Sequence, residues 1–161
     1  MTTIVSDTSP INYLVLIEAI EILPALFERI LIPPAVHAEL QNPRTPAAVF
    51  RWAAALPAWA KIQQPAIIDR AIGLGAGETE AISLALELHI PAIIIDEQKG
   101  RIAASERGLL PVGTLDLLNR ADIRGLVDFE DAIRKLRLTN FRIDPALVEM
   151  VLAQVRARKG A

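Results

Sequence analysis

Short apolar runs alternate along the chain with longer segments of helical period. The runs predict strands at 2–5, 29–32, 92–95 and 109–112, with a further short strand near 60–63. Apolar residues three and four apart predict helices in the segments between and after them, at 10–17, 22–27, 34–40, 46–56, 78–89, 98–107, 114–120, 128–138 and 144–158. Pro10, Pro34 and Pro145 suit first helical turns, Asp144 is a candidate N-cap, and the glycines of 73–77 predict a loop.

Strands separated by helices imply parallel pairing, because a parallel connection needs a long crossover. We therefore expect an α/β fold in which a central, mostly parallel sheet is flanked by helices on both faces. The pattern predicts a single domain over 1–161, with the C-terminal helices of about 114–160 packing on the same core. Functional groups in such sheets gather beyond the carboxyl ends of the strands, where Asp7 and Asp96 lie.

Composition excludes several kinds of site. The 161 residues are 52% hydrophobic and include no cysteine, which removes disulfides, thiol catalysis and cysteine-ligated zinc. The two histidines, His37 and His89, are not expected to form a zinc site or a catalytic triad. We see no secretory signal and no apolar run of the ~18 residues that cross a bilayer, so we expect a cytoplasmic protein without membrane association.

Charge is divided unevenly along the chain. Residues 1–97 hold 5 lysines and arginines against 11 acids, whereas residues 98–161 hold 12 against 8. An acidic half that binds cations, followed by a basic half that faces phosphates, would suit an enzyme acting on nucleic acid. Ordinary variation between helical surfaces would give the same division.

Acidic residues recur at positions where the fold would bring them together. The candidate catalytic and metal-binding residues are Asp7, Glu39, Glu78, Asp96 and Glu97. Each has a structural alternative: Asp7 could cap a helix, although Ser9 could do so equally well; Glu39 could be solvated; Glu78 could interact with a helix dipole; and Asp96 could form a turn. Together, three or four carboxylates suit Mg²⁺ or Mn²⁺, hard cations that activate water and neutralise charge at phosphorus.

Three other polar residues lie close to these acids in the sequence. Ser9 and Asn12 follow Asp7 and could bind a phosphate or a water molecule, or serve the helix that begins there. Arg101 lies one helical turn beyond Glu97, where its guanidinium could orient an acid or contact a phosphate.

Four segments resemble the PIN-domain family, and in particular its branch of small prokaryotic proteins related to toxin components of toxin–antitoxin pairs. These segments are Val5–Pro10, Pro33–Leu40, Gly77–Ile82 and Ile94–Arg101. Residue by residue, the resemblance places the family's acids on Asp7, Glu39, Glu78 and either Glu97 or Asp96. Many members have Asp where this chain has Glu78, which extends the carboxylate by one methylene.

The resemblance implies Mg²⁺- or Mn²⁺-dependent endonucleolytic cleavage of RNA, and often inhibition by a partner antitoxin. We further expect a homodimer or higher oligomer, to which the apolar stretch between Trp52 and Trp59 could contribute if it is not core. The basic end of the last predicted helix either stabilises that helix terminus or touches RNA. With one tyrosine, two tryptophans and four phenylalanines, the sequence shows no evident base-stacking platform.

Two other interpretations stay open. A receiver-like signalling domain would also bind Mg²⁺ at strand-end acids, but it would not need Glu39. A PIN-like fold without catalysis could serve as an interaction module.

Overall fold

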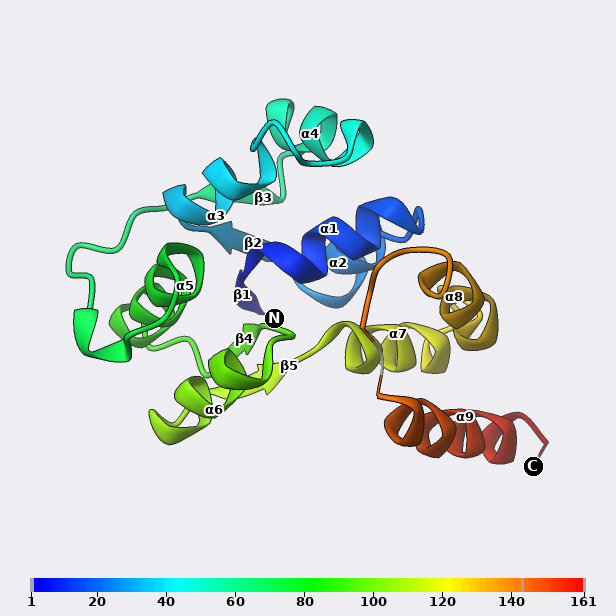
Figure 1. Cartoon of the computed structure of the whole chain (residues 1–161). Helices are drawn as coiled ribbons and strands as arrows, with labels where there is room; N and C mark the ends of the chain where they lie inside the picture. The colour runs from blue at the N-terminus through cyan, green and yellow to red at the C-terminus, as the bar shows by residue number, and fades with distance from the viewer. Residues whose placement is uncertain (1, 143, 161) are drawn as a thin grey trace.

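A five-stranded parallel sheet forms the centre of the computed structural model, which describes residues 2–142 and 144–160 (Figure 1). Its strands are β1 (Thr3–Ser6), β2 (Arg29–Ile32), β3 (Ala60–Ile62), β4 (Ala92–Ile94) and β5 (Leu110–Val112). They lie in the order β3-β2-β1-β4-β5, and every pairing is parallel. The predicted α/β class and central sheet are thus confirmed, and the short strand expected near 60–63 is present.

The order in which successive strands are added to the sheet changes direction at β1. From β1 it proceeds outward through β2 to β3, and then it returns to add β4 and β5 on the other side. Val5 of β1 consequently pairs with Leu31 on one side and with Ile93 on the other. In open α/β sheets the crevice at such a switch point is the usual place for a ligand.

The helices connect and follow the strands. They are α1 (Thr8–Leu16), α2 (Ile22–Leu26), α3 (Pro34–Leu40), α4 (Ala47–Ala54), the 3₁₀ helix η1 (Arg70–Ile72), α5 (Ala76–Glu87), α6 (Gln98–Glu106), α7 (Thr114–Ile123), α8 (Phe129–Leu136) and α9 (Pro145–Gly160). No helix in the described part of the chain is long and apolar enough to cross a membrane.

Most of the predicted helix boundaries differ from the structure by a few residues, and two of these differences lie next to the candidate site. The first helix begins at Thr8, not near Pro10. The backbone of Asp7 is still extended (ψ 176°), and helical geometry starts with the next residue. The fifth begins at Ala76, so Gly77 is helical and does not belong to the predicted loop. The short η1 was not predicted; Asp69 caps it by accepting a bond from the Ala71 amide (3.0 Å).

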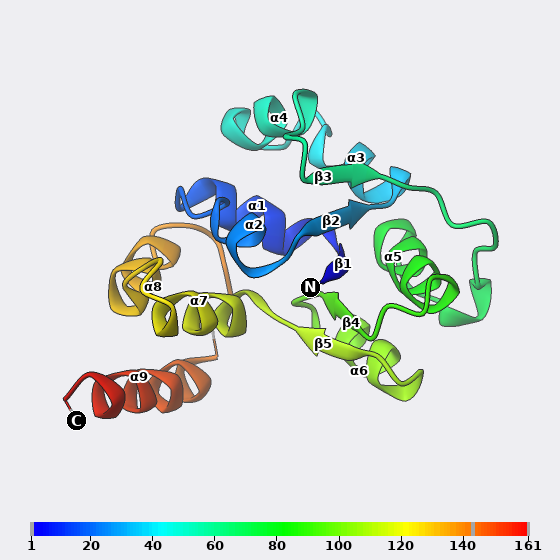
Figure 2. The ribbon, with the colours of Figure 1, turned by 180° about the vertical axis from the view of Figure 1, so that it is seen from behind.

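Alternate residues of β1, β2 and β4 enter separate cores on the two faces of the sheet. Ile4, Ile30 and Ile94 pack with α1 to α4 and α7 to α9, whereas Val5 and Leu31 pack with α5 and α6. Figures 1 and 2 accordingly show α5 on one side of β1 and β4, and α1 with α7 on the other. Both faces are therefore covered, as the apolar runs predicted.

The C-terminal helix packs on the first of these cores. Val148, Leu152 and Val155 of α9 are buried there, and the predicted N-cap is present because Asp144 accepts a bond from the Ala146 amide (3.0 Å). Trp52 and Trp59 also pack against this core, with ring centroids 5.9 Å apart. That contact favours the structural role for the two tryptophans.

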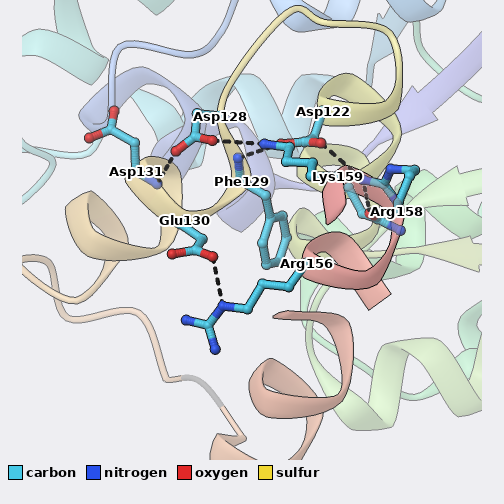
Figure 3. Close-up of polar contacts among 9 residues, drawn as sticks. Asp122, Asp128, Phe129, Glu130, Asp131, Arg156, Arg158 and Lys159 are labelled. Atoms are coloured by element: carbon cyan, nitrogen blue, oxygen red, sulfur yellow. Dashed lines mark hydrogen bonds and ion pairs between the residues drawn. The ribbon is translucent and has the colours of Figure 1, made fainter. Parts of the chain in front are cut away.

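The basic end of α9 is paired with acids of α7 and α8 (Figure 3). Arg158 and Lys159 donate to the two carboxylate oxygens of Asp122 (2.9 and 2.7 Å), whose side chain is only 1% exposed. The Phe129 amide donates to Asp122 as well (2.7 Å), and Arg156 pairs with Glu130 (2.8 Å). Burial alone would raise the pKa of Asp122, but the bonds from Lys159, Phe129 and Arg158 outweigh it and lower that pKa.

Replacing Asp122 with alanine should destabilise the fold, because it leaves the buried Phe129 amide unpaired and releases both cations of α9. We expect a loss of about 2 kcal/mol in the free energy of unfolding, and hence a decrease in Tm of roughly 4 to 8 °C. Asp131→Ala is the matched control, since its pairs with Arg134 and Lys135 are exposed and should contribute no more than about 0.5 kcal/mol. Equal Tm values for the two variants would contradict this role of Asp122.

Candidate functional site

Asp7 lies at the carboxyl end of β1, where the chain turns into α1. Its backbone amide donates to the Ile94 carbonyl (2.9 Å), which fixes it against the end of β4. It occupies the N-cap position of α1, yet its carboxylate makes no capping bond among the described residues. Ser9 lies inside the first turn, so the expectation that it could be the cap is wrong.

The carboxyl group of Asp7 is held in an environment that disfavours its charge. The residue is 6% exposed, and burial is the main cause that raises its pKa to about 7. The Thr8 amide opposes this shift, whereas the carboxylates of Glu78, Glu39 and Asp96 add to it. The three other acids therefore lie near enough to Asp7 to affect its ionisation.

Glu39 reaches the site from α3 and contacts the start of α5. It accepts a bond from the Gly77 amide (3.2 Å) and a short one from the Thr8 hydroxyl. A Cβ at Gly77 would lie 2.7 Å from each carboxylate oxygen of Glu39, so a larger residue there would displace the Glu39 carboxylate from its present position. Glu80 on α5 strengthens the junction by accepting a bond from the Ala35 amide of α3 (3.0 Å).

Glu78, on the first turn of α5, carries an unsatisfied oxygen. Its Oε2 is buried, and no hydrogen-bond partner for it is found within residues 2–142 and 144–160. Burial, followed by the charges of Glu97 and Glu39, raises the pKa of Glu78. A buried carboxylate oxygen without a donor is unfavourable unless a proton or a cation satisfies it.

Asp96 follows β4, and its side chain is held by Thr114, which begins α7 just after β5. The Thr114 amide and hydroxyl donate to its two oxygens (2.7 and 2.6 Å). Burial raises the pKa of Asp96, while Thr114 and the charge of Arg101 oppose the rise. The sequence analysis assigned no role to Thr114. Its position at the start of α7, just after β5, which pairs with β4, is the signal that could have identified it.

Glu97 and Arg101 frame the same edge of the sheet. Glu97 is exposed at the N-cap position of α6, and its charge contributes to the raised pKa of Glu78. Arg101 donates from Nη1 to the Ile95 carbonyl (3.0 Å). The charge of Asp96 thus adds to the raised pKa of Asp7, and that of Glu97 adds to the raised pKa of Glu78. Asp96 and Glu97 therefore both lie near the other acids.

Two cavities adjoin the acids. The larger, of about 900 Å³, is lined by Ser9, Asp96, Glu97 and Arg101 among others. The smaller, of about 480 Å³, is lined by Asn12 and Glu39. Ser9 and Asn12 open into different cavities, and neither cavity is lined by Asp7 or Glu78, which lie near the other acids by the effect of their charges.

The acids are suited to a divalent cation, although they do not enclose one. No three acidic or histidine side chains in the described part of the chain gather closely enough to hold a metal ion. Glu39 contacts Thr8 and Gly77, and Asp96 contacts Thr114. The unpartnered Glu78 oxygen and the raised pKa values of Asp7 and Glu78, to which burial and then neighbouring acids contribute, nevertheless fit a hard cation, because added positive charge would offset both.

The sequence was compared with known proteins. A family model described as a PIN domain matches residues 3–157, which include all the elements described above except the end of α9. A comparison with curated proteins finds no match.

Asp7→Asn should stabilise the metal-free protein in a pH-dependent manner. The parent keeps the Asp7 proton when folded and loses it when unfolded between the ordinary pKa of 3.8 and about 7, so its stability falls as pH rises through that interval. The variant lacks this loss, and its advantage in unfolding free energy should grow by up to about 4 kcal/mol from pH 4 to pH 8. Urea unfolding in EDTA at several pH values measures the difference; a constant difference would contradict the raised pKa.

Proposed function

The chain belongs to the PIN-domain family, whose fold is of the nuclease type, and from this premise we propose that it is a metal-dependent endoribonuclease. The observation that carries the proposal is the convergence of Asp7, Glu39, Glu78 and Asp96 at the switch point of the sheet, with one buried Glu78 oxygen unpartnered. Four mutually repelling carboxylates at a ligand-binding position are unfavourable in an apo protein and useful in one that binds cations.

Mg²⁺ or Mn²⁺ is the cofactor that this donor set suits, since both prefer carboxylate oxygens. Asp7, Glu39 and Glu78 would hold it, together with Asp96 or Glu97. When bound, such a cation neutralises charge on a phosphodiester and lowers the pKa of water.

The protein's own contribution is to position these acids and the substrate. Thr114 fixes both oxygens of Asp96, and the bond from Gly77 directs Glu39 toward the start of α5. Arg101 lies beside Asp96 in the larger cavity, where its guanidinium can donate to a phosphate. Ser9 and Asn12 offer weaker polar contacts on the two sides of the acids.

The strand order argues against a receiver-like signalling domain. Receiver domains have the order 2-1-3-4-5, whereas this sheet has 3-2-1-4-5. Glu39, which a receiver would not need, lies close enough to Asp7 to raise its pKa. A PIN-like interaction module without catalysis is the remaining alternative, and the activity assay below distinguishes it.

We assign the protein, as part of the same proposal, to the toxin components of toxin–antitoxin pairs. The support is the resemblance of the four acid-bearing segments to that branch of the family. RNA is then the substrate, a cognate antitoxin the inhibitor, the cytoplasm the place of action, and a homodimer or higher oligomer the expected assembly.

The experiment is cleavage of a mixed RNA pool by the purified protein with Mg²⁺, Mn²⁺ or EDTA. We expect divalent-dependent cleavage that Asp7→Asn and Glu78→Gln each reduce by at least ~100-fold, about 2.7 kcal/mol of transition-state stabilisation. Glu106→Gln, an exposed acid near the end of α6, is the control and should cleave like the parent. Calorimetry with Mn²⁺ should show binding to the parent and its loss in Asp7→Asn.

Cleavage that persists in EDTA, or in Asp7→Asn at the parental rate, would refute the proposed site. Mn²⁺ binding without cleavage of any RNA would support the proposed metal site and contradict the proposed nuclease activity. Neither binding nor cleavage would favour the interaction module.

A further inference from the structure

The larger cavity has an aromatic wall beside the acids. Tyr13 of α1, the only tyrosine of the chain, packs edge-on against Phe141 with ring centroids 4.7 Å apart. Its hydroxyl donates to Asn140 Oδ1 (2.9 Å). Asn140 and Phe141, which follow α8, thus lie against Tyr13 of α1, and two aromatic rings far apart in the sequence become neighbours.

Tyr13 separates the two cavities that adjoin the acids. It lines the larger one together with Asp96 and Arg101, and the smaller one together with Glu39 and Arg44. Burial raises the pKa of the Tyr13 hydroxyl, and the charge of Asp96 adds to this shift, which is consistent with the proximity of the two side chains. A chain that crosses the acids from one cavity to the other would therefore pass this ring.

The polar groups around the rings are of the kind that recognises bases. Asn119, Asn140 and Gln154 line the larger cavity with amides that can both donate and accept hydrogen bonds. Aromatic faces and such amides are the features with which proteins bind unpaired RNA bases. The cavity volume of about 900 Å³ lies within the range of pockets that enclose a small organic ligand.

The charges in this cavity are nearly balanced. Asp116 and Asp144 line it in addition to Asp96 and Glu97, against Arg101 and Arg142. Asp116 is paired with Arg120, and Asp144 caps α9. The two remaining acids are matched by the two arginines, so the charge of the cavity excludes neither a neutral nucleobase nor the phosphates that flank it.

We propose that Tyr13 and Phe141 form a nucleobase-stacking subsite for single-stranded RNA. The proposal rests on the proposed ribonuclease function and adds to it the residues that hold a base next to the scissile phosphate. Arg101 and Arg142 are then the cations available to the flanking phosphates. Through these two rings, a chain with few aromatic residues can bind unpaired RNA bases.

The test measures RNA binding separately from cleavage. In the Asp7→Asn background, fluorescence anisotropy follows a labelled single-stranded RNA of about eight nucleotides, within the range that such grooves bind. Tyr13→Leu and Phe141→Leu should each raise the Kd by about 5- to 100-fold, the range for loss of one stacked base. Tyr13→Phe, which keeps the ring and loses the bond to Asn140, should change the Kd by less than about 3-fold. Phe50→Leu, an exposed ring on α4 outside both cavities, is the matched control.

Two further readouts separate stacking from a merely structural effect. An abasic oligonucleotide of the same length should bind equally to the Asp7→Asn background and to Tyr13→Leu in that background, because it has no base to stack. Irradiation of 5-iodouridine RNA bound to the protein with both rings intact should give crosslinks that mass spectrometry maps to Tyr13 or Phe141. This second measurement needs no substitution of a ring that also packs on the core.

Unchanged RNA affinity in both leucine variants, or crosslinks confined to other residues, would overturn the subsite. That is also the result expected if a partner peptide, not RNA, occupies the cavity. If the parent still cleaves RNA with Mg²⁺ in that case, the nuclease proposal stands and only the subsite fails. If the parent neither cleaves nor binds RNA, both proposals fail together.

Discussion

The repulsion among carboxylates at the carboxyl edge of the sheet is the constraint on which the site depends. Asp7 is almost fully buried, and its nearest charged neighbours are other acids, so its carboxyl group keeps a proton to about pH 7. The scaffold holds this arrangement with neutral donors: the Thr114 amide and hydroxyl, the Gly77 amide and the Thr8 hydroxyl. These donors let the edge of the sheet fold, while its acids still lack the positive charge that would offset their repulsion.

The parallel sheet determines which acids can meet. Because β1 lies between β2 and β4, the strand ends that carry Asp7 and Asp96 are adjacent, and the helix after β2 brings Glu39 over the same edge. The crossover through α5 returns the chain to β4 and contributes Glu78 on its first turn. Gly77 and Gly100 leave space for these side chains, since a Cβ at Gly77 would contact Glu39 and one at Gly100 would contact Ile95 and Glu78.

The C-terminal region contributes to the site as well as to stability. The pairs of Asp122 with Arg158 and Lys159 hold α9 against α7 and α8. The segment that leads into α9 carries Asn140 and Phe141 to Tyr13, beside Asp96. The cations at the end of α9, which the sequence left available for RNA, are instead paired within the protein.

The sequence by itself determined the elements, the parallel α/β class and the candidate acids, because apolar period and strand-end position are local properties of the chain. It could not identify Thr114, Gly77 or the Tyr13–Phe141 pair as partners of the site, since each partnership joins residues brought together only by strand order and helix packing. That Asp7 and not Ser9 occupies the N-cap position of α1 likewise depended on where the extended backbone ends. A carboxylate's residue type can be read from the chain, but its ionisation depends on burial and on neighbours distant in sequence, which only the tertiary structure decides.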